Sequence, residues 1–269
     1  MLLERFEVID AHCHIYPEKI ARKAAQATGD FYGEPPAEDG TVERLLESGA
    51  QVGIDRFIVQ SVATTPQQVR KINQFIHDEV AAHPQKLVGL GTLHPDSEDI
   101  EGDIRHLQSL GLKGVKLHPD IQGFKIDDYR CLKIYEICER EGLPILMHTG
   151  DSRYDYSNPN RMLPILEIYS KLTVIGAHFG GFSVWEEACE RLSGCPNLVV
   201  DCSSSLGYIT PTLAKKLIAA YGTNRVLFGT DYPLHFVKDE VEMLLSLGLS
   251  DEDYRKIFSE NAKRVYGLK

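Results

Sequence analysis

The feature that most constrains this chain is a regular alternation of short apolar runs with amphipathic segments. Eight runs rich in β-branched residues predict strands, at residues 6–11, 56–62, 87–93, 112–117, 144–148, 172–177, 198–202 and 226–229. After the first gap they recur roughly every 30 residues, the length of a strand, a loop and a crossover helix. This alternation predicts parallel strands covered by helices.

The segments between the runs predict helices, among them 66–82, 99–110, 128–141, 210–221 and 250–266. Because eight such units allow the sheet to close, we predict a single (β/α)8 TIM barrel over residues 1–269, with a doubly wound open sheet as the alternative. The first gap, from about residue 15 to 55, predicts a long first βα loop, and a loop of that length is usually functional.

Composition restricts the class of protein further. The chain has 269 residues with 29 basic and 39 acidic side chains, and no basic run could follow a nucleic-acid backbone. Six cysteines without a C-x-x-C pair indicate a reducing compartment. Without a signal-like start or an apolar run long enough to span a membrane, we expect a cytoplasmic protein with no membrane partner. The sequence is compatible with a homodimer.

Two histidines mark the end of the first predicted strand. His12 and His14 are two residues apart, so the strand pleat points both side chains to the same face. In a barrel one of those faces is the interior. Neutral imidazoles converging there suit a borderline metal ion such as zinc.

Three further polar side chains end other predicted strands. His148 closes the fifth run, His178 closes the sixth, and Asp231 closes the eighth. The carboxyl ends of barrel strands are where catalytic groups gather, because their side chains meet over one mouth. The sequence therefore predicts a common site.

The fourth strand carries Lys116 and His118, which share a face and point to the same mouth. A lysine inside a barrel is costly unless it pairs, binds an anion or changes its charge state. Lys116 could accordingly be carbamylated, bind a substrate carboxylate, or pair with an internal acid. His118 could contact substrate or support a neighbouring side chain.

The order of these motifs resembles a known group. D-x-H-x-H, K-L-H-P, M-H-T-G, A-H-F-G-G and G-T-D-Y-P follow one another as in the amidohydrolase superfamily. The similarity is greatest to the amidohydrolase-related branch that includes aminocarboxymuconate-semialdehyde decarboxylase. The resemblance implies a TIM barrel that binds one divalent ion, usually Zn²⁺, through His12, His14, His148 and Asp231.

The same resemblance implies roles beyond metal binding. Asp231 would also handle a proton, and His178 would act beside the metal as acid or base. A lysine in a similar setting is carbamylated in dihydroorotase-like members, so a second ion bridged by Lys116 stays open.

We therefore expect a metal-dependent hydrolase that uses an activated water on an amide, lactone or ester of a small polar, carboxylated substrate. Lys116, His118 and Arg153 are the predicted substrate-binding residues, Arg153 because its planar guanidinium can bind a carboxylate with two hydrogen bonds. The alternative is a non-oxidative decarboxylase of a small unsaturated acid that uses the same metal site. A non-catalytic binding barrel is a third hypothesis.

Overall fold

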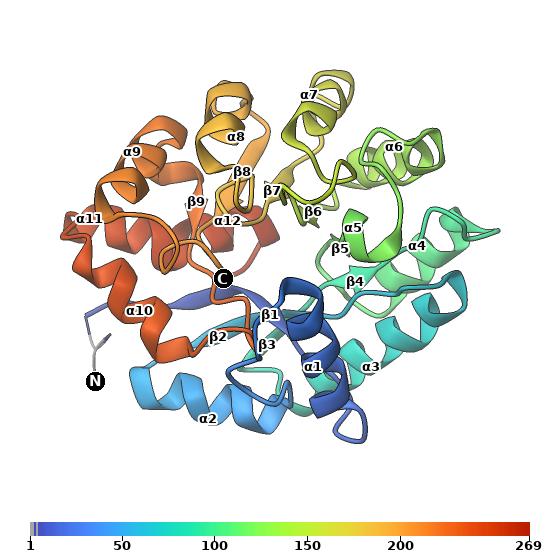
Figure 1. Cartoon of the computed structure of the whole chain (residues 1–269). Helices are drawn as coiled ribbons and strands as arrows, with labels where there is room; N and C mark the ends of the chain where they lie inside the picture. Colours follow the sequence, from blue (N-terminus) through green and yellow to red (C-terminus); the bar gives the residue numbers. More distant parts are fainter. Residues whose placement is uncertain (1–2, 4) are drawn as a thin grey trace.

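The strands of the computed structural model, which describes residue 3 and residues 5–269, form one parallel barrel surrounded by helices (Figure 1). They pair in the orders β1-β2-β3 and β4-β5-β6-β7-β8-β9. Their bounds are β1 Ile9–His14, β2 Arg56–Gln60, β3 Leu87–Gly89, β4 Gly91–Thr92, β5 Val115–Leu117, β6 Ile145–Met147, β7 Val174–Gly176, β8 Leu198–Asp201 and β9 Val226–Leu227.

Two joints complete the barrel. β3 and β4 are halves of one strand, because the backbone N–H of Leu90 donates to Val59 O on one side and that of Gly91 donates to Gly114 O on the other. The seam between β1 and the segment after β9 is closed by backbone hydrogen bonds from Ala11 to Phe228 and from Asp231 to His12. The predicted TIM barrel is thus confirmed.

Helices alternate with the strands and cover the outside of the barrel (Figure 1). The longer ones are α1 Ala21–Tyr32, α2 Val42–Val52, α3 Val69–Ala82, α4 Ile100–Ser109, α6 Leu132–Glu141, α7 Pro159–Ile168, α8 Trp185–Leu192, α9 Pro211–Tyr221 and α10 Val237–Ser246. The short elements are α5 Pro119–Gln122, α11 Asp251–Arg255, α12 Asn261–Tyr266, a π-helical turn Lys256–Glu260, and the 3₁₀ turns Pro66–Gln68, Tyr129–Cys131 and Thr223–Arg225.

The first gap differs from the predicted long loop because it contains two helices. α2 begins at a Thr41 cap that accepts a hydrogen bond from the backbone N–H of Arg44, and it ends at Gly53 in a left-handed conformation. α1 precedes α2 and contributes side chains to the wall of a cavity of about 540 Å³. The insertion is therefore largely helical, and its first helix, α1, lies next to the barrel mouth.

Two apolar layers hold the barrel together. The interior is filled by strand side chains that include Ile9, Ile58, Leu146 and Leu227, and α12 packs Tyr266 against them. A larger layer lies between the strands and the helices. Burial of this kind dominates the stability of such folds. Within the described residues, no helix is both long and apolar enough to cross a membrane.

Candidate metal centre

Seven side chains at the carboxyl ends of the barrel strands lie on the wall of one cavity of about 540 Å³. We call these seven the cavity floor. All are buried, and they comprise His12, His14, Lys116, His118, His148, His178 and Asp231. The structure thus brings together seven of the eight site residues predicted from the sequence.

Three donor atoms of the floor stand close together. Nε2 of His12 lies 3.3 Å from Nε2 of His14, and Oδ1 of Asp231 lies 3.3 and 3.5 Å from these two nitrogens. Ligands about 2.0–2.1 Å from an ion at tetrahedral corners would be about 3.3–3.4 Å apart. The His12, His14 and Asp231 triad therefore fits a divalent ion in spacing and in donor chemistry.

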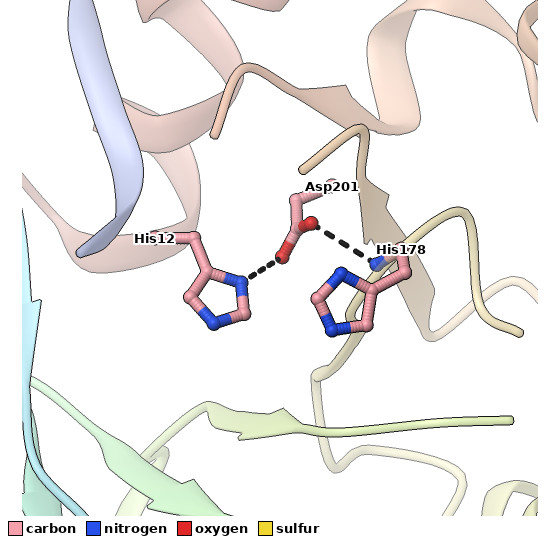
Figure 2. Close-up of side chains that lie close together, drawn as sticks. All are labelled: His12, His178 and Asp201. Atoms are coloured by element: carbon pink, nitrogen blue, oxygen red, sulfur yellow. Dashed lines mark hydrogen bonds and ion pairs between the residues drawn. The ribbon is translucent and has the colours of Figure 1, made fainter. Parts of the chain in front are cut away.

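Asp201 fixes the orientation of His12 (Figure 2). Its Oδ2 lies 3.0 Å from Nδ1 of His12, and its Oδ1 accepts hydrogen bonds from the backbone N–H of His178 and from Oγ of Ser203. Burial alone would raise the pKa of Asp201, but the facing His12 and these hydrogen bonds hold it below its ordinary value. The carboxylate can thus hold the Nδ1–H tautomer, which leaves the Nε2 lone pair toward the triad.

Hydrogen bonds also fix the orientation of Asp231. Oγ of Ser204 donates to its Oδ2 at 2.6 Å, and Nε2 of His235 lies 3.0 Å from that hydroxyl. Burial would raise the pKa of Asp231, yet the surrounding histidines and Lys116 lower it below its ordinary value. Its backbone has a φ of 59°, which is uncommon outside glycine and is typical of functional sites.

His148 lies beside the triad, in a different group of potential ligands. Its Nδ1 is 3.1 Å from Nε2 of His178, and its Nε2 is 3.5 Å from Oδ2 of Asp120. It also stacks on His118, with ring centroids 4.0 Å apart. Among the described residues, Nε2 of His148 and Oδ1 of Asp120 have no hydrogen-bond partner. His148, predicted as the fourth ligand, is therefore grouped here with His118 and Asp120.

Burial favours the neutral form of four of the floor imidazoles. It lowers the pKa of His14, His118 and His148 well below the ordinary histidine value, and it lowers that of His178 to about 4. Neutral imidazole is the form that binds metal ions, because each ring then has a free lone pair. The electrostatics of the floor thus agree with the spacing of the triad.

Lys116 points into the centre of the floor. Its Nζ lies 2.9 Å from Nε2 of His12, and burial lowers its pKa to about 8. In the part of the chain that the structure describes, it forms no ion pair with a carboxylate within 4 Å. Of its three predicted roles, a direct pair with an internal acid is therefore not what the structure shows.

His118 connects the floor to α1. Its Nε2 lies 2.8 Å from the hydroxyl of Tyr32, the last residue of that helix, and its Nδ1 accepts a hydrogen bond from the backbone N–H of Ile121. The Tyr32 hydroxyl also lies 3.4 Å from Nδ1 of His148. The end of α1 therefore contacts two of the buried histidines directly.

Arg153, predicted to bind the substrate carboxylate, does not line the cavity. Its guanidinium donates to both carboxylate oxygens of Asp151 through Nε and Nη2, and it donates through Nη1 to the carbonyl of Phe31 at 2.7 Å. It also lies over the rings of Phe31, Tyr32 and Tyr154. Because all three guanidinium nitrogens are engaged in these contacts, Arg153 holds the end of α1 in this structure, and its role as a carboxylate anchor stays a prediction.

Two carboxylates of the site were not predicted from the sequence. Asp201 ends β8 just as His14 ends β1, but the predicted strand ran through it to residue 202 and concealed it. Asp120 follows His118-Pro119 in α5, where a strand-end rule does not apply. Applying the strand-end rule to every acid would have found the first, whereas the second required the fold.

Solved structures share this barrel over nearly the whole chain. An uncharacterized TIM-barrel protein from Bordetella bronchiseptica has a TM-score of 0.81 at 24% identity, over 97% of this chain and 99% of its own. A 5-carboxyvanillate decarboxylase from Novosphingobium aromaticivorans, complexed with manganese and 4-hydroxy-3-methoxy-5-nitrobenzoic acid, has a TM-score of 0.77 at 17% identity, over 98% and 97%. Other aromatic-acid decarboxylases share the fold as well. At these identities the likeness shows the fold alone.

One curated relative matches part of the sequence. It is 2-amino-3-carboxymuconate-6-semialdehyde decarboxylase from Dictyostelium discoideum, 28% identical over 109 residues. That alignment covers 38% of this chain and 30% of the relative.

A family model covers far more of the chain. The model described as amidohydrolase matches residues 9–268, a range that contains the whole cavity floor. It confirms the resemblance drawn from the order of the motifs. The chain therefore belongs to the amidohydrolase family.

Proposed function

We propose that this protein is a metal-dependent, non-oxidative decarboxylase of a small carboxylic acid whose carboxyl group is attached to an aromatic ring or another unsaturated carbon. The observation that carries the proposal is a polar cavity floor beneath a largely apolar wall. The floor presents the triad of His12, His14 and Asp231. A planar apolar acid could place its charged group on that floor and its ring against the wall.

The fold neighbours support decarboxylation over the hydrolysis expected from the sequence. Several of them are decarboxylases of aromatic acids, and two such enzymes were crystallised with manganese. The partial relative from Dictyostelium is also a decarboxylase. The metal ligands do not discriminate between the two reactions, because either one needs a cation beside the reacting group.

A divalent ion bound at the triad would supply a positive charge that orients an anionic substrate and stabilises charge developing in the transition state. The other interactions come from side chains of the protein. Lys116 places its amine on the floor, 2.9 Å from Nε2 of His12, where it could contact the carboxylate of the substrate. Asp201 and Ser204 hold His12 and Asp231 in place.

Loss of carbon dioxide leaves an electron pair on carbon, which must receive one proton. We assign that proton to Nε2 of His178. Nδ1 of the same ring lies 3.0 Å from the carbonyl of Ser203, so it can donate there and leave Nε2 facing the floor. Nε2 lies 3.1 Å from Nδ1 of His148, so the two rings can share a proton. An anionic substrate would favour the protonated form that burial alone disfavours.

The test is a substrate panel given to protein loaded with Mn²⁺ or Zn²⁺ in separate samples. The panel pairs hydroxybenzoates and unsaturated acids with lactones, esters and amides of similar size. We expect carbon dioxide from a member of the first set and, in D₂O, one carbon-bound deuterium at the vacated position of the product. Hydrolysis products without carbon dioxide would reject the proposal.

Hydrolysis is the second candidate because the matching family model is described as amidohydrolase. His178 would then accept a proton from the attacking water, a role that suits its neutral state. The same panel decides between the two, since a hydrolase would release an alcohol or amine and no gas.

A further inference from the structure

The cavity extends well beyond the floor. From the triad it continues between α1 and α3, the two helices that lie near β3 in Figure 1. On the α1 side its wall includes Ile20, Ala24 and Ala27, which recur at the three- and four-residue spacing of one helix face. On the α3 side it includes Ile72 and Phe75. We call the space between these five side chains the α1–α3 groove.

The cavity is larger than a one-ring acid requires. Its volume of about 540 Å³ is roughly 18 times the ~30 Å³ that a water molecule occupies in the liquid. An acid with one ring would leave much of this volume unfilled. Volumes of this order are typical of sites that bind drug-sized molecules.

The side chains of α1 keep the groove open. Ala24 and Ala27 are the smallest residues that a helix can place there without glycine, and Ile20 at the edge is 52% exposed. A surface helix usually buries its apolar face against the protein, whereas this face borders open cavity. Gln68, in the 3₁₀ turn before α3, and Lys71, on α3 itself, also line the cavity and are polar and exposed, which sets an outer limit to the apolar space.

We propose that the substrate is a carboxylic acid with an apolar alkyl or aryl extension remote from its carboxyl group, and that this extension lies in the α1–α3 groove. The inference rests on the proposed function, because that function places the carboxylate at the floor. Ala24 and Ala27 are then specificity-determining residues, since their size sets the length that fits.

The test is calorimetric binding of benzoate and of 4-alkylbenzoates from methyl to hexyl to the metal-loaded protein. Each methylene that enters the groove should tighten binding about fourfold, until the groove is filled. Equal affinity along the series, with benzoate itself bound, would overturn the inference and leave the decarboxylase proposal standing. Failure of every acid to bind would overturn both.

The variant Ala27→Trp tests whether the extension lies in the α1–α3 groove. The indole should fill the groove and abolish the dependence of affinity on chain length. Lys23→Trp is the matched control, because Lys23 is exposed on the same helix and does not line the cavity. An unchanged chain-length dependence in Ala27→Trp would overturn the assignment to this groove. Melting temperatures check that both variants fold, and the wild-type series decides the proposal independently of them.

Discussion

At the scale of single residues, the chemistry of the cavity floor depends on how its side chains are oriented as well as on which residues they are. His12 can present Nε2 to the triad because Asp201 engages Nδ1 at 3.0 Å, and Asp231 is fixed through Ser204. The sequence predicted His12 and Asp231 because both stand at strand ends. Ser204 could not be predicted in the same way, because its role depends on a hydrogen bond to Asp231, which lies 27 residues further along the chain.

Asp201→Asn tests this orientation. The amide oxygen can keep the contacts to Ser203 and to the backbone of His178, but the NH₂ group would face Nδ1 of His12 and favour the wrong tautomer. We expect divalent-metal affinity to fall about 10- to 100-fold, with a similar loss of activity. Competition with a chromophoric chelator measures the affinity, and circular dichroism checks the fold. Unchanged metal affinity would show that Asp201 does not orient His12.

At the scale of elements, the alternating pattern predicted the strands and most helices, with errors that have physical reasons. The first strand was placed at 6–11 and lies at Ile9–His14, because its ladder continues through polar residues that pair across the closing seam. α1 was predicted as loop because it has no side-chain cap and contains Gly29. Its packing against the barrel mouth supplies the stability that its own sequence lacks.

Arg153→Met tests how the end of α1 is held. The variant loses the guanidinium hydrogen bonds to Asp151 and to Phe31, although the Arg153 side chain is 42% exposed and solvent weakens these bonds. A net loss of about 1 kcal/mol would make amide exchange roughly fivefold faster near residues 29–34. Hydrogen exchange with mass spectrometry measures this. Metal affinity should stay unchanged, because Arg153 does not touch the floor, and uniform exchange rates would contradict the assignment.

At the scale of the whole molecule, the barrel tolerates buried carboxyl groups away from the site. Glu240 on α10 is buried, and its Oε2 has no hydrogen-bond partner among the described residues. Burial, followed by the nearby Asp231 and Asp10, raises its pKa well above 4.5. In the folded protein it keeps its proton at pH values where the unfolded chain has lost it. Its contribution to stability is therefore present below about pH 4.5 and is lost as the pH rises through its folded pKa.

Glu240→Gln should accordingly stabilise the protein at neutral pH. A gain of about 1 kcal/mol would raise the melting temperature by roughly 2–4 °C in a domain of this size. The difference from wild type should shrink as the pH falls toward 4.5, because the carboxyl group of Glu240 then also becomes protonated in the unfolded chain. Glu242→Gln on the exposed side of the same helix is the control. A melting difference that does not vary between pH 4.5 and 8 would contradict the prediction.

The central claim is that His12, His14 and Asp231, from opposite ends of the sequence, bind one divalent ion. A crystal structure of metal-loaded protein, with anomalous data at the absorption edge of the ion, tests it most directly. We expect one strong peak within about 2.0–2.3 Å of Nε2 of His12, Nε2 of His14 and a carboxylate oxygen of Asp231. A stoichiometric peak elsewhere, or none at saturating metal, would contradict it.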